Sequence, residues 1–292
     1  MIVLENELLT VHISPSGAEV RKVFHKKTGL DYMWSGDSQY WGRVSPVLFP
    51  IVGRLKRDRY ALEGRSYRMP QHGFLRDVEF TVQDQEKEYA AFCFDPLDSF
   101  LDIYPFRFQV VIYYTLKEDS LNVCWEIKNE HQEKMYFSIG AHPAFNVPLQ
   151  AEEKAEDYTL NFTPAAGRQV TQYKLVNSMA KEKKTVQTIE PISIQSSLFE
   201  QDAFIYSHID RVSLRSNRTG HGVEVDLAGF PFVGIWSSYN KKTGTMAPFV
   251  CIEPWYGIAD TVDASGKLDE KLGINELEPG GRFEANYTIS FI

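Results

Sequence analysis

The sequence lacks the features that mark secreted, membrane-spanning and disulfide-stabilised proteins. Its 292 residues contain only three cysteines, Cys93, Cys124 and Cys251, too widely spaced for a disulfide framework or a CxxC metal pattern. No run approaches the roughly 18 apolar residues of a membrane span. Residues 1–11 lack the basic region and long apolar core of a signal peptide. These absences predict a soluble, cytoplasmic protein without a membrane partner.

Basic clusters and nucleotide-binding motifs are also missing. The net charge is −8, and the 31 basic residues are dispersed except around residues 181–184, which excludes the basic footprint of a nucleic-acid-binding protein. No GxSxG, P-loop, GxGxxG or HExxH motif occurs. Acyl transfer, nucleotide phosphate chemistry and zinc proteolysis therefore have no support in the sequence.

What the sequence does contain is a succession of short β-strand patterns. Leu121, Val123, Trp125 and Ile127 alternate with polar residues, and residues 106–116 and 121–130 flank a polar turn as a long hairpin. No pattern predicts a helix of more than two or three turns, and neither a fixed-period repeat nor a Gly/Ser linker divides the chain. We expect residues 1–292 to form a single domain, an all-β fold built as one large antiparallel β-sandwich. The polar residues 150–200 are expected to form excursions or short β-ribbons.

Three segments carry the candidate chemistry: residues 71–77, 140–146 and 251–257. They contain His72, His142 and Glu253, each near the end of an apolar run and beside a proline or glycine. Functional side chains are commonly displayed at such strand ends. An imidazole and a carboxylate held on stiff backbone supply the acid and base of a proton-transfer site. We therefore expect the three segments to converge.

Other interpretations of these residues stay open. His72 and His142 could each be a core residue that is hydrogen-bonded to backbone. For Glu253, the alternative is a structural ion pair with Arg54 or Arg76. Two histidines and a glutamate suggest a metal, but no His-x-His, His-x-x-x-His or Glu-x-x-His spacing is present, so we predict neither a metal nor another cofactor. By sequence alone, aspartates 77, 202 and 260 are expected to be solvated or to cap turns.

Five motifs in the same order resemble the aldose 1-epimerase (galactose mutarotase) superfamily, and most closely its LacX-like branch. The resemblance extends from about residue 2 to the C-terminus. Each motif is weak alone, but five in register are specific. They are Tyr40-Trp41-Gly42-Arg43, Pro46-Val47-Leu48-Phe49-Pro50, Gly53-Arg54-Leu55-Lys56, Gln71-His72-Gly73-Phe74 and Gly140-Ala141-His142-Pro143.

The resemblance implies a mutarotase-like β-sandwich that interconverts the α and β anomers of a free aldose. It implies that Glu253, which precedes Pro-Trp, is the general base and that His142 is the general acid. It also implies that His72 and Arg54 hold the sugar, with residues 46–54 delivering Arg54 into the cavity. Asp202 is the candidate for an aspartate that contacts sugar hydroxyls. Trp255, with Trp41, Phe74 and Phe145, is placed either near the sugar or in plain core.

Related branches act on hexose 6-phosphates, which makes a sugar phosphate an alternative ligand. Arg54 and Arg76 would then form a charge-assisted clamp, whereas Arg76 otherwise pairs with Asp77 or Glu79 on the surface. The rival functions are a non-catalytic sugar-binding or sugar-sensing protein on the same fold and a glycoside-processing enzyme. No second carboxylate in a comparably apolar setting accompanies Glu253, which argues against the latter. Monomer and homodimer are both compatible with the sequence.

Overall fold

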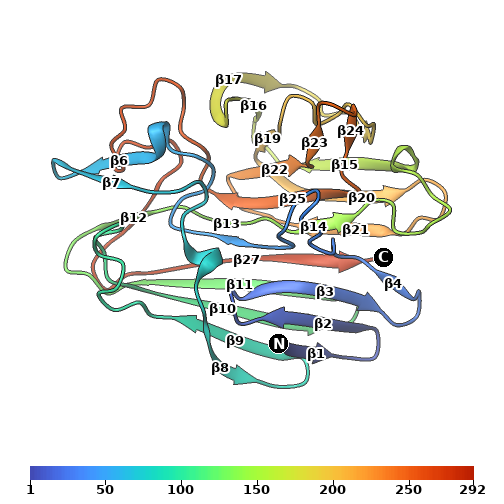
Figure 1. The fold of residues 1–292 in the computed structure, drawn as a ribbon, viewed down its shortest axis with the longest axis horizontal. Helices are drawn as coiled ribbons and strands as arrows, with labels where there is room; N and C mark the ends of the chain where they lie inside the picture. The colour runs from blue at the N-terminus through green and yellow to red at the C-terminus, as the bar shows by residue number, and fades with distance from the viewer.

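The computed structural model describes the backbone of residues 1–292 and the side chains of all of them except Glu182. Antiparallel strands dominate it (Figure 1), and the helices are three short 3₁₀ turns: η1 (Lys56–Asp58), η2 (Leu75–Asp77) and η3 (Ala155–Asp157). Across the described part of the chain, no helix is long and apolar enough to cross a membrane. The predicted all-β, antiparallel fold is confirmed.

Two large sheets, one four-stranded sheet and three two-stranded ribbons contain all the strands. The nine-stranded sheet runs β18 (Ile192–Ser193), β15 (Tyr158–Pro164), β20 (Ile209–Ser216), β21 (Gly222–Asp226), β27 (Arg282–Phe291), β11 (Ser120–Asn129), β10 (Phe108–Lys117), β9 (Tyr89–Phe94), β8 (Thr81–Gln85). The eight-stranded sheet runs β17 (Met179–Val186), β16 (Val170–Val176), β19 (Phe204–Ser207), β22 (Phe232–Trp236), β25 (Phe249–Tyr256), β13 (Ile139–Ala141), β5 (Val47–Leu48), with β14 (Ala144–Asn146) also on β25. The four-stranded sheet runs β1 (Ile2–Glu5), β2 (Leu9–Ser14), β3 (Glu19–His25), β4 (Leu30–Asp31). The ribbons pair β6 (Arg59–Leu62) with β7 (Arg65–Arg68), β12 (Met135–Phe137) with β26 (Asn275–Leu277), and β23 (Tyr239–Asn240) with β24 (Thr245–Met246).

The long hairpin predicted from the sequence is β10–β11. Its register places Leu116 opposite Leu121 and Phe108 opposite Asn129. Along β11, Leu121, Val123, Trp125 and Ile127 are buried while the residues between them are half-buried, as the alternation predicted. This hairpin lies between β27 and β9 in the nine-stranded sheet.

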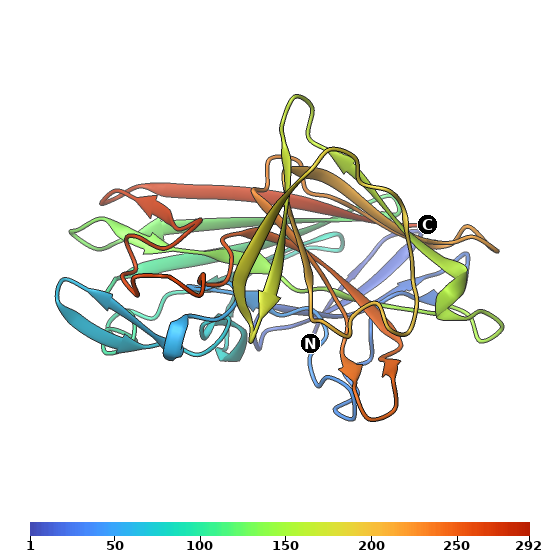
Figure 2. The same ribbon diagram turned by 90° about the horizontal axis from the view of Figure 1, so that it is seen from above.

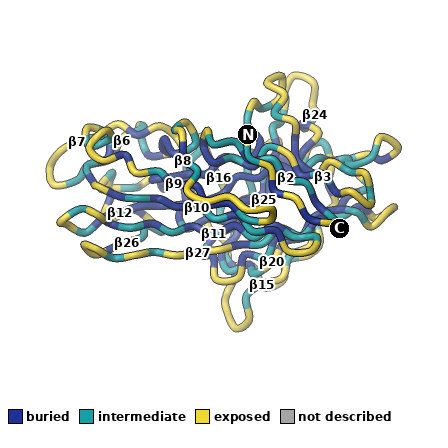
Figure 3. Tube along the Cα trace, turned by 90° about the horizontal axis from the view of Figure 1, so that it is seen from below, coloured by how far each residue is buried: buried dark blue, intermediate teal, exposed yellow. Residues whose placement is uncertain are grey.

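One hydrophobic cluster connects the three sheets. It includes Val11 of β2, Val123 of β11 and Ile252 of β25. Figure 3 shows the buried positions concentrated along the central strands and the exposed ones in the connecting loops. Burying this apolar surface is the main stabilisation, at about 25 cal/mol per Å² removed from water.

Strand β25 is buried on both faces, which explains why its sequence is a continuous apolar run. Val250 and Ile252 face the central core, whereas Phe249 and Cys251 join a separate cluster on the opposite face of the sheet. Because side chains alternate along a strand, Glu253 projects on the same face as Cys251. The strand therefore presents its one carboxylate on the face away from the central core.

The polar residues 150–200 contribute more to the sheets than the sequence predicted. β15 joins the nine-stranded sheet, and the β16–β17 hairpin forms one end of the eight-stranded sheet. This hairpin lies along the top edge in Figure 1 and faces the viewer in Figure 2. The charged composition misled the prediction because an edge hairpin keeps one side in water.

A buried carboxylate secures the loop before β15. Glu153 accepts hydrogen bonds from the hydroxyl groups of Tyr158, Ser216 and Thr219. Burial alone would raise the pKa of this carboxyl, but the three hydrogen bonds and the nearby Arg218 together lower it. A lowered folded-state pKa means that the ionised form stabilises the fold above the unfolded pKa, and that this contribution is lost as the pH falls through the folded-state value.

We expect Glu153→Gln to lower the free energy of unfolding by roughly 1–3 kcal/mol near pH 7, because charged hydrogen bonds are replaced by neutral ones. The difference between the two proteins should shrink as the pH falls below the unfolded-state pKa of about 4.3 and through the lower folded-state pKa of Glu153. Thermal unfolding followed by circular dichroism from pH 3 to pH 8 measures this. An equal difference at every pH would show that packing, not charge, explains the loss.

Candidate active site

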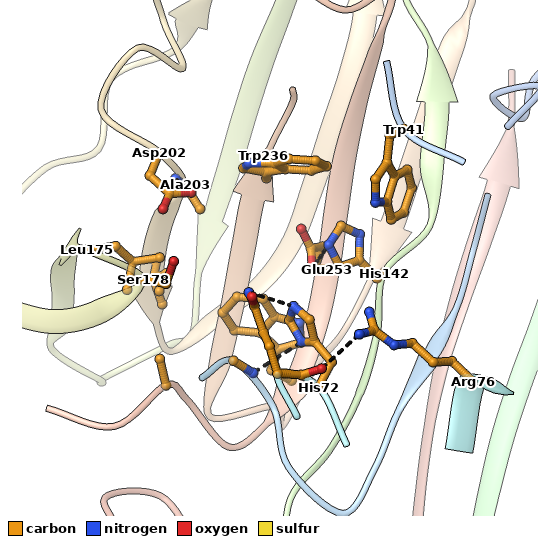
Figure 4. Close-up of a pocket in the computed structure, with 15 residues that line it drawn as sticks. Trp41, His72, Arg76, His142, Leu175, Ser178, Asp202, Ala203, Trp236 and Glu253 are labelled. Atoms are coloured by element: carbon orange, nitrogen blue, oxygen red, sulfur yellow. Dashed lines mark hydrogen bonds and ion pairs between the residues drawn. The ribbon is translucent and has the colours of Figure 1, made fainter. Parts of the chain in front are cut away.

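A cavity of about 350 Å³ opens on the face of the eight-stranded sheet that carries Glu253. Figure 4 shows His142 and Glu253 at its centre, Trp41 and Trp236 on one side, His72 opposite, and Asp202 and Arg76 at the two ends. All three predicted segments contribute: His72, His142 and Glu253 line the same cavity. A volume near 300 Å³ is at the small end of ligand pockets and suits a monosaccharide-sized molecule.

The strand register brings His142 and Glu253 together. Gly140 of β13 faces Trp255, and Ala144 of β14 faces Cys251, so His142, midway between them, comes opposite Glu253. His142 Nε2 lies 3.3 Å from Glu253 Oε2, and both residues are buried, with exposed fractions of 7% and 1%. Because β13 and β14 both pair with β25, the segment between them holds the imidazole of His142 against the carboxylate of Glu253.

On the other side of Glu253 the neighbouring strand has no side chain. Gly234 of β22 faces Glu253, and a Cβ at that position would lie 2.5 Å from the indole ring of Trp255. A side chain there would displace Trp255, which also lines the cavity. Gly234 therefore makes room for the Trp255 ring beside the carboxylate.

His72 is held by its backbone and its ring. Its φ is +67°, and it precedes Gly73, where a Cβ would lie 2.1 Å from the carbonyl oxygen of Phe49. The Gly53 N–H donates to His72 Nδ1 at 3.2 Å, and the His72 N–H donates to the Gly53 carbonyl. Because Nδ1 accepts a hydrogen bond, the neutral ring carries its proton on Nε2. His72 Nε2 lies 3.3 Å from the side-chain amide of Gln71, so with the proton on Nε2 an oxygen, of this amide or of a ligand, is the acceptor that it requires.

Aromatic rings surround His142. Trp41 stacks on it with ring centroids 4.7 Å apart, and Trp236 and His72 meet it edge-on at 5.4 and 5.6 Å. The stacked indole restricts rotation of the imidazole, and the π face of an indole attracts a positive charge. These contacts orient His142 and favour its protonated form when a ligand supplies the proton.

Burial dominates the charges of the central pair. It lowers the pKa of His142 to about 3. It raises the pKa of Glu253 well above the usual range, and the nearby charge of Asp202 raises it further. Desolvation also lowers the pKa of His72. Burial therefore disfavours the charged form of each of these groups.

Several polar atoms at the cavity have no hydrogen-bond partner among the described residues. Of seven such buried side-chain atoms, four belong to residues lining this cavity: Arg76 Nε, His142 Nδ1, Glu253 Oε2 and Trp255 Nε1. Buried polar groups are normally satisfied. Their concentration here indicates that the cavity accommodates a polar ligand.

The two arginines expected near the ligand lie in different places. Arg76 lines the cavity; its Nη2 donates to the Gln71 carbonyl at 2.8 Å, and burial lowers its pKa to about 10. Arg54 does not line it: its guanidinium makes a two-pronged pair with Asp58 at 2.7 and 2.8 Å. The chain does deliver this segment to the cavity, but through Gly53, while the Asp58 carboxylate holds Arg54 outside.

Asp202 and Trp255 both line the cavity. Asp260 differs from the expected solvated or capping aspartate, because it is buried and lies 3.4 Å from the equally buried Lys271 ammonium. Its other oxygen accepts the Lys56 N–H, and its N–H donates to the Arg54 carbonyl. Asp260 thus anchors the loop that carries Ala259 to the cavity wall.

Sequence reasoning missed three contributors to this site. Trp236 ends β22 without any motif, and Gln71 was noted only as a neighbour of His72. Cys251 was considered only for its spacing from the other cysteines, although it lies beside the central pair. Only the strand register, which the sequence does not reveal, places these residues there.

The fold, with a polar cavity on one large sheet, is that of a galactose mutarotase-like protein. The model of the family described as aldose 1-epimerase matches residues 1–268, and the chain belongs to this family. It is similar to the chromosomal protein LacX of Lactococcus lactis subsp. lactis, with 32% identity over 100% of this chain and 99% of LacX.

Solved structures agree. The galactose mutarotase related enzyme from Lactobacillus acidophilus is 36% identical and superposes with a TM-score of 0.93 over 99% of this chain and 96% of that one. A galactose mutarotase-like protein from Lactobacillus casei ATCC 334 is 29% identical, with a TM-score of 0.91 over 100% of both chains. The predicted family resemblance is confirmed.

Proposed function

We propose that this protein is a mutarotase, which interconverts the α and β anomers of a free aldose or a hexose phosphate by opening and reclosing the sugar ring. The observation that carries the proposal is the buried His142–Glu253 pair, 3.3 Å apart in a monosaccharide-sized cavity that includes unpartnered polar atoms. Family membership supports the same activity.

In the proposed reaction Glu253 removes the proton from the C1 hydroxyl while His142 gives one to the ring oxygen. The C1–O5 electron pair moves to the ring oxygen, and C1 becomes an aldehyde. Rotation about C1–C2 and reclosure on the other face, with the two roles reversed, yields the other anomer. His72 Nε2–H, Asp202 and Arg76 are proposed to hold the sugar oxygens.

The buried pair suits this sequence of steps. Ring opening leaves Glu253 protonated and His142 neutral, which is the arrangement that burial favours. The site therefore stabilises the protonation state that accompanies the open-chain sugar. Each well-placed proton transfer contributes roughly 10²–10⁴-fold to the rate.

Polarimetry tests the activity. Freshly dissolved α-glucose, α-galactose and their 6-phosphates should reach anomeric equilibrium faster with catalytic amounts of the protein. The order of the rates ranks the substrates. Sugar binding without acceleration of any of them would replace the proposal with a non-catalytic binding or sensing protein.

Oxygen labelling tests the bond that breaks. With ¹⁸O at C1, ring opening at C1–O5 retains the label through many enzymatic turnovers, apart from the slow loss seen without protein. Loss of the label in step with anomer exchange would show that C1–O1 breaks instead, as in glycoside-type chemistry.

Two arginines provide a matched test of ligand binding. Arg76→Gln should raise the KM by roughly 10- to 100-fold, since a charged hydrogen bond of about 1.5–3 kcal/mol is lost. Arg54→Gln should leave the KM unchanged, because the Arg54 guanidinium pairs with Asp58 outside the cavity. If Arg76→Gln affects only the 6-phosphates, Arg76 holds the phosphate; an effect of Arg54→Gln equal to that of Arg76→Gln would contradict the placement.

A further inference from the structure

Beside the proposed acid and base lies a third group that the mutarotase reaction does not use, the thiol of Cys251. Cys251 and Glu253 are two residues apart on β25, so both project from the same face of the sheet. His142 comes from the adjoining strand segment opposite them. One ligand atom of each residue lies within 4.8 Å of the ligand atoms of the other two, and all three residues are buried.

We propose that His142, Cys251 and Glu253 form a binding site for a thiophilic divalent cation of the zinc type, and that the cation excludes the sugar. One imidazole nitrogen, one thiolate and one carboxylate are typical ligands of zinc, whereas magnesium and calcium prefer oxygen alone. Three protein ligands leave a fourth position toward the cavity for water.

The geometry is close to what such a cation requires. In a tetrahedral site with bonds of about 2.0–2.3 Å, ligand atoms lie roughly 3.3–3.8 Å apart. His142 Nε2 and Glu253 Oε2 are already 3.3 Å apart, and rotation of the Cys251 and Glu253 side chains closes the remaining difference of about 1 Å. The strands that carry the three residues are paired and need not move.

Two further observations point to a ligand at this position. Glu253 Oε2 is buried without a hydrogen-bond partner in the described part of the molecule. Cys251 also contacts an apolar cluster that includes Trp34 and Phe249. An apolar surrounding shields a metal–thiolate bond from water, and the cavity gives the cation a route in.

Binding requires deprotonated ligands. The Cys251 thiol gives up its proton to solvent, and the thiolate and the Glu253 carboxylate together balance the two positive charges of the cation. A monovalent cation would not achieve this balance with both ligands deprotonated.

Cobalt titration tests the site without reference to activity. Tag-free protein treated with a chelator should bind one Co²⁺ per chain, with the visible absorption of tetrahedral cobalt and a near-ultraviolet thiolate-to-metal charge-transfer band. Zn²⁺ should displace it. Weak octahedral absorption alone, or no charge-transfer band, would overturn the proposal.

The cysteine variants locate the thiolate. Cys251→Ser should abolish the charge-transfer band and weaken binding by at least roughly tenfold, whereas Cys124→Ser, on the half-buried face of β11, should retain the band. Circular dichroism confirms folding of each variant, and Glu253→Gln, which keeps the thiol, should also weaken binding. A band that survives Cys251→Ser or disappears in Cys124→Ser would place the metal elsewhere.

Inhibition of mutarotation by Zn²⁺ tests whether the cation excludes the sugar. Saturating Zn²⁺ should abolish mutarotation, and a chelator should restore it. If the cobalt bands appear as described but the metal-free protein has no mutarotase activity, the proposed function fails and the metal site stands. If the activity is present and the bands are absent, the reverse holds.

Discussion

Glu253→Gln is expected to lower the kcat for anomer interconversion by roughly 10²–10⁴-fold, while sugar binding changes little. The amide has nearly the shape of the carboxyl and keeps its hydrogen-bonding capacity, but it cannot accept the proton of the C1 hydroxyl. The loss should therefore appear in kcat rather than in KM, as for an interaction that acts in the transition state. Polarimetry over a range of sugar concentrations separates the two constants.

A matched control is Glu153→Gln, which replaces another buried glutamate by the same amide. Glu153 lies in the loop before β15, where it accepts hydrogen bonds from hydroxyl groups, and it does not line the cavity. Its variant should lose stability and retain the mutarotation rate at a temperature where both proteins are folded. Equal loss of rate in the two variants would mean that the effect comes from folding, and Glu253 would not be the base.

His142→Gln should produce a loss of the same order, because His142, whose Nε2 lies 3.3 Å from the Glu253 carboxylate, is the proposed donor of the proton to the ring oxygen. The glutamine side chain can donate a hydrogen bond but cannot transfer the proton. The double variant Glu253→Gln/His142→Gln should be only slightly slower than either single variant, since the two groups transfer protons in the same ring-opening step. The rates are measured in the same polarimetric assay.

His25→Gln is the control for this substitution. His25 is buried to the same extent as His142, with an exposed fraction of 7%, but its Nδ1 accepts the Thr28 N–H in a turn remote from the cavity. Its variant should keep the rate of the wild type. If the loss of rate in the double variant equals the product of the losses in the two single variants, the residues act independently, which would contradict a shared step.

Local patterns were sufficient to predict the strands and the three site segments. The alternation along β11 predicted its buried face, and the Gly- and Pro-bounded positions of His72, His142 and Glu253 predicted that they would be displayed together. These features depend on neighbours in sequence. Family resemblance then supplied the roles, which the site variants above test.

The remaining features depend on contacts between distant segments. Arg54 was expected in the cavity, but its guanidinium forms an ion pair with Asp58, four residues on. Asp260 has no distinguishing sequence context, and its buried carboxylate pairs with the distant Lys271. Cys251 belongs to an apolar run, and only the register of β25 against the segment around His142 brings its thiol to the central pair.

The most direct test of the central claim is exchange NMR spectroscopy on a sugar already at anomeric equilibrium. At equilibrium no net change occurs, so cross-peaks between the α and β C1 protons report the interconversion itself. The account predicts that wild-type protein creates these cross-peaks and that Glu253→Gln removes them while the protein still binds the sugar. Exchange of the same rate with Glu253→Gln, or none with wild-type protein on any of the sugars that it binds, would contradict it.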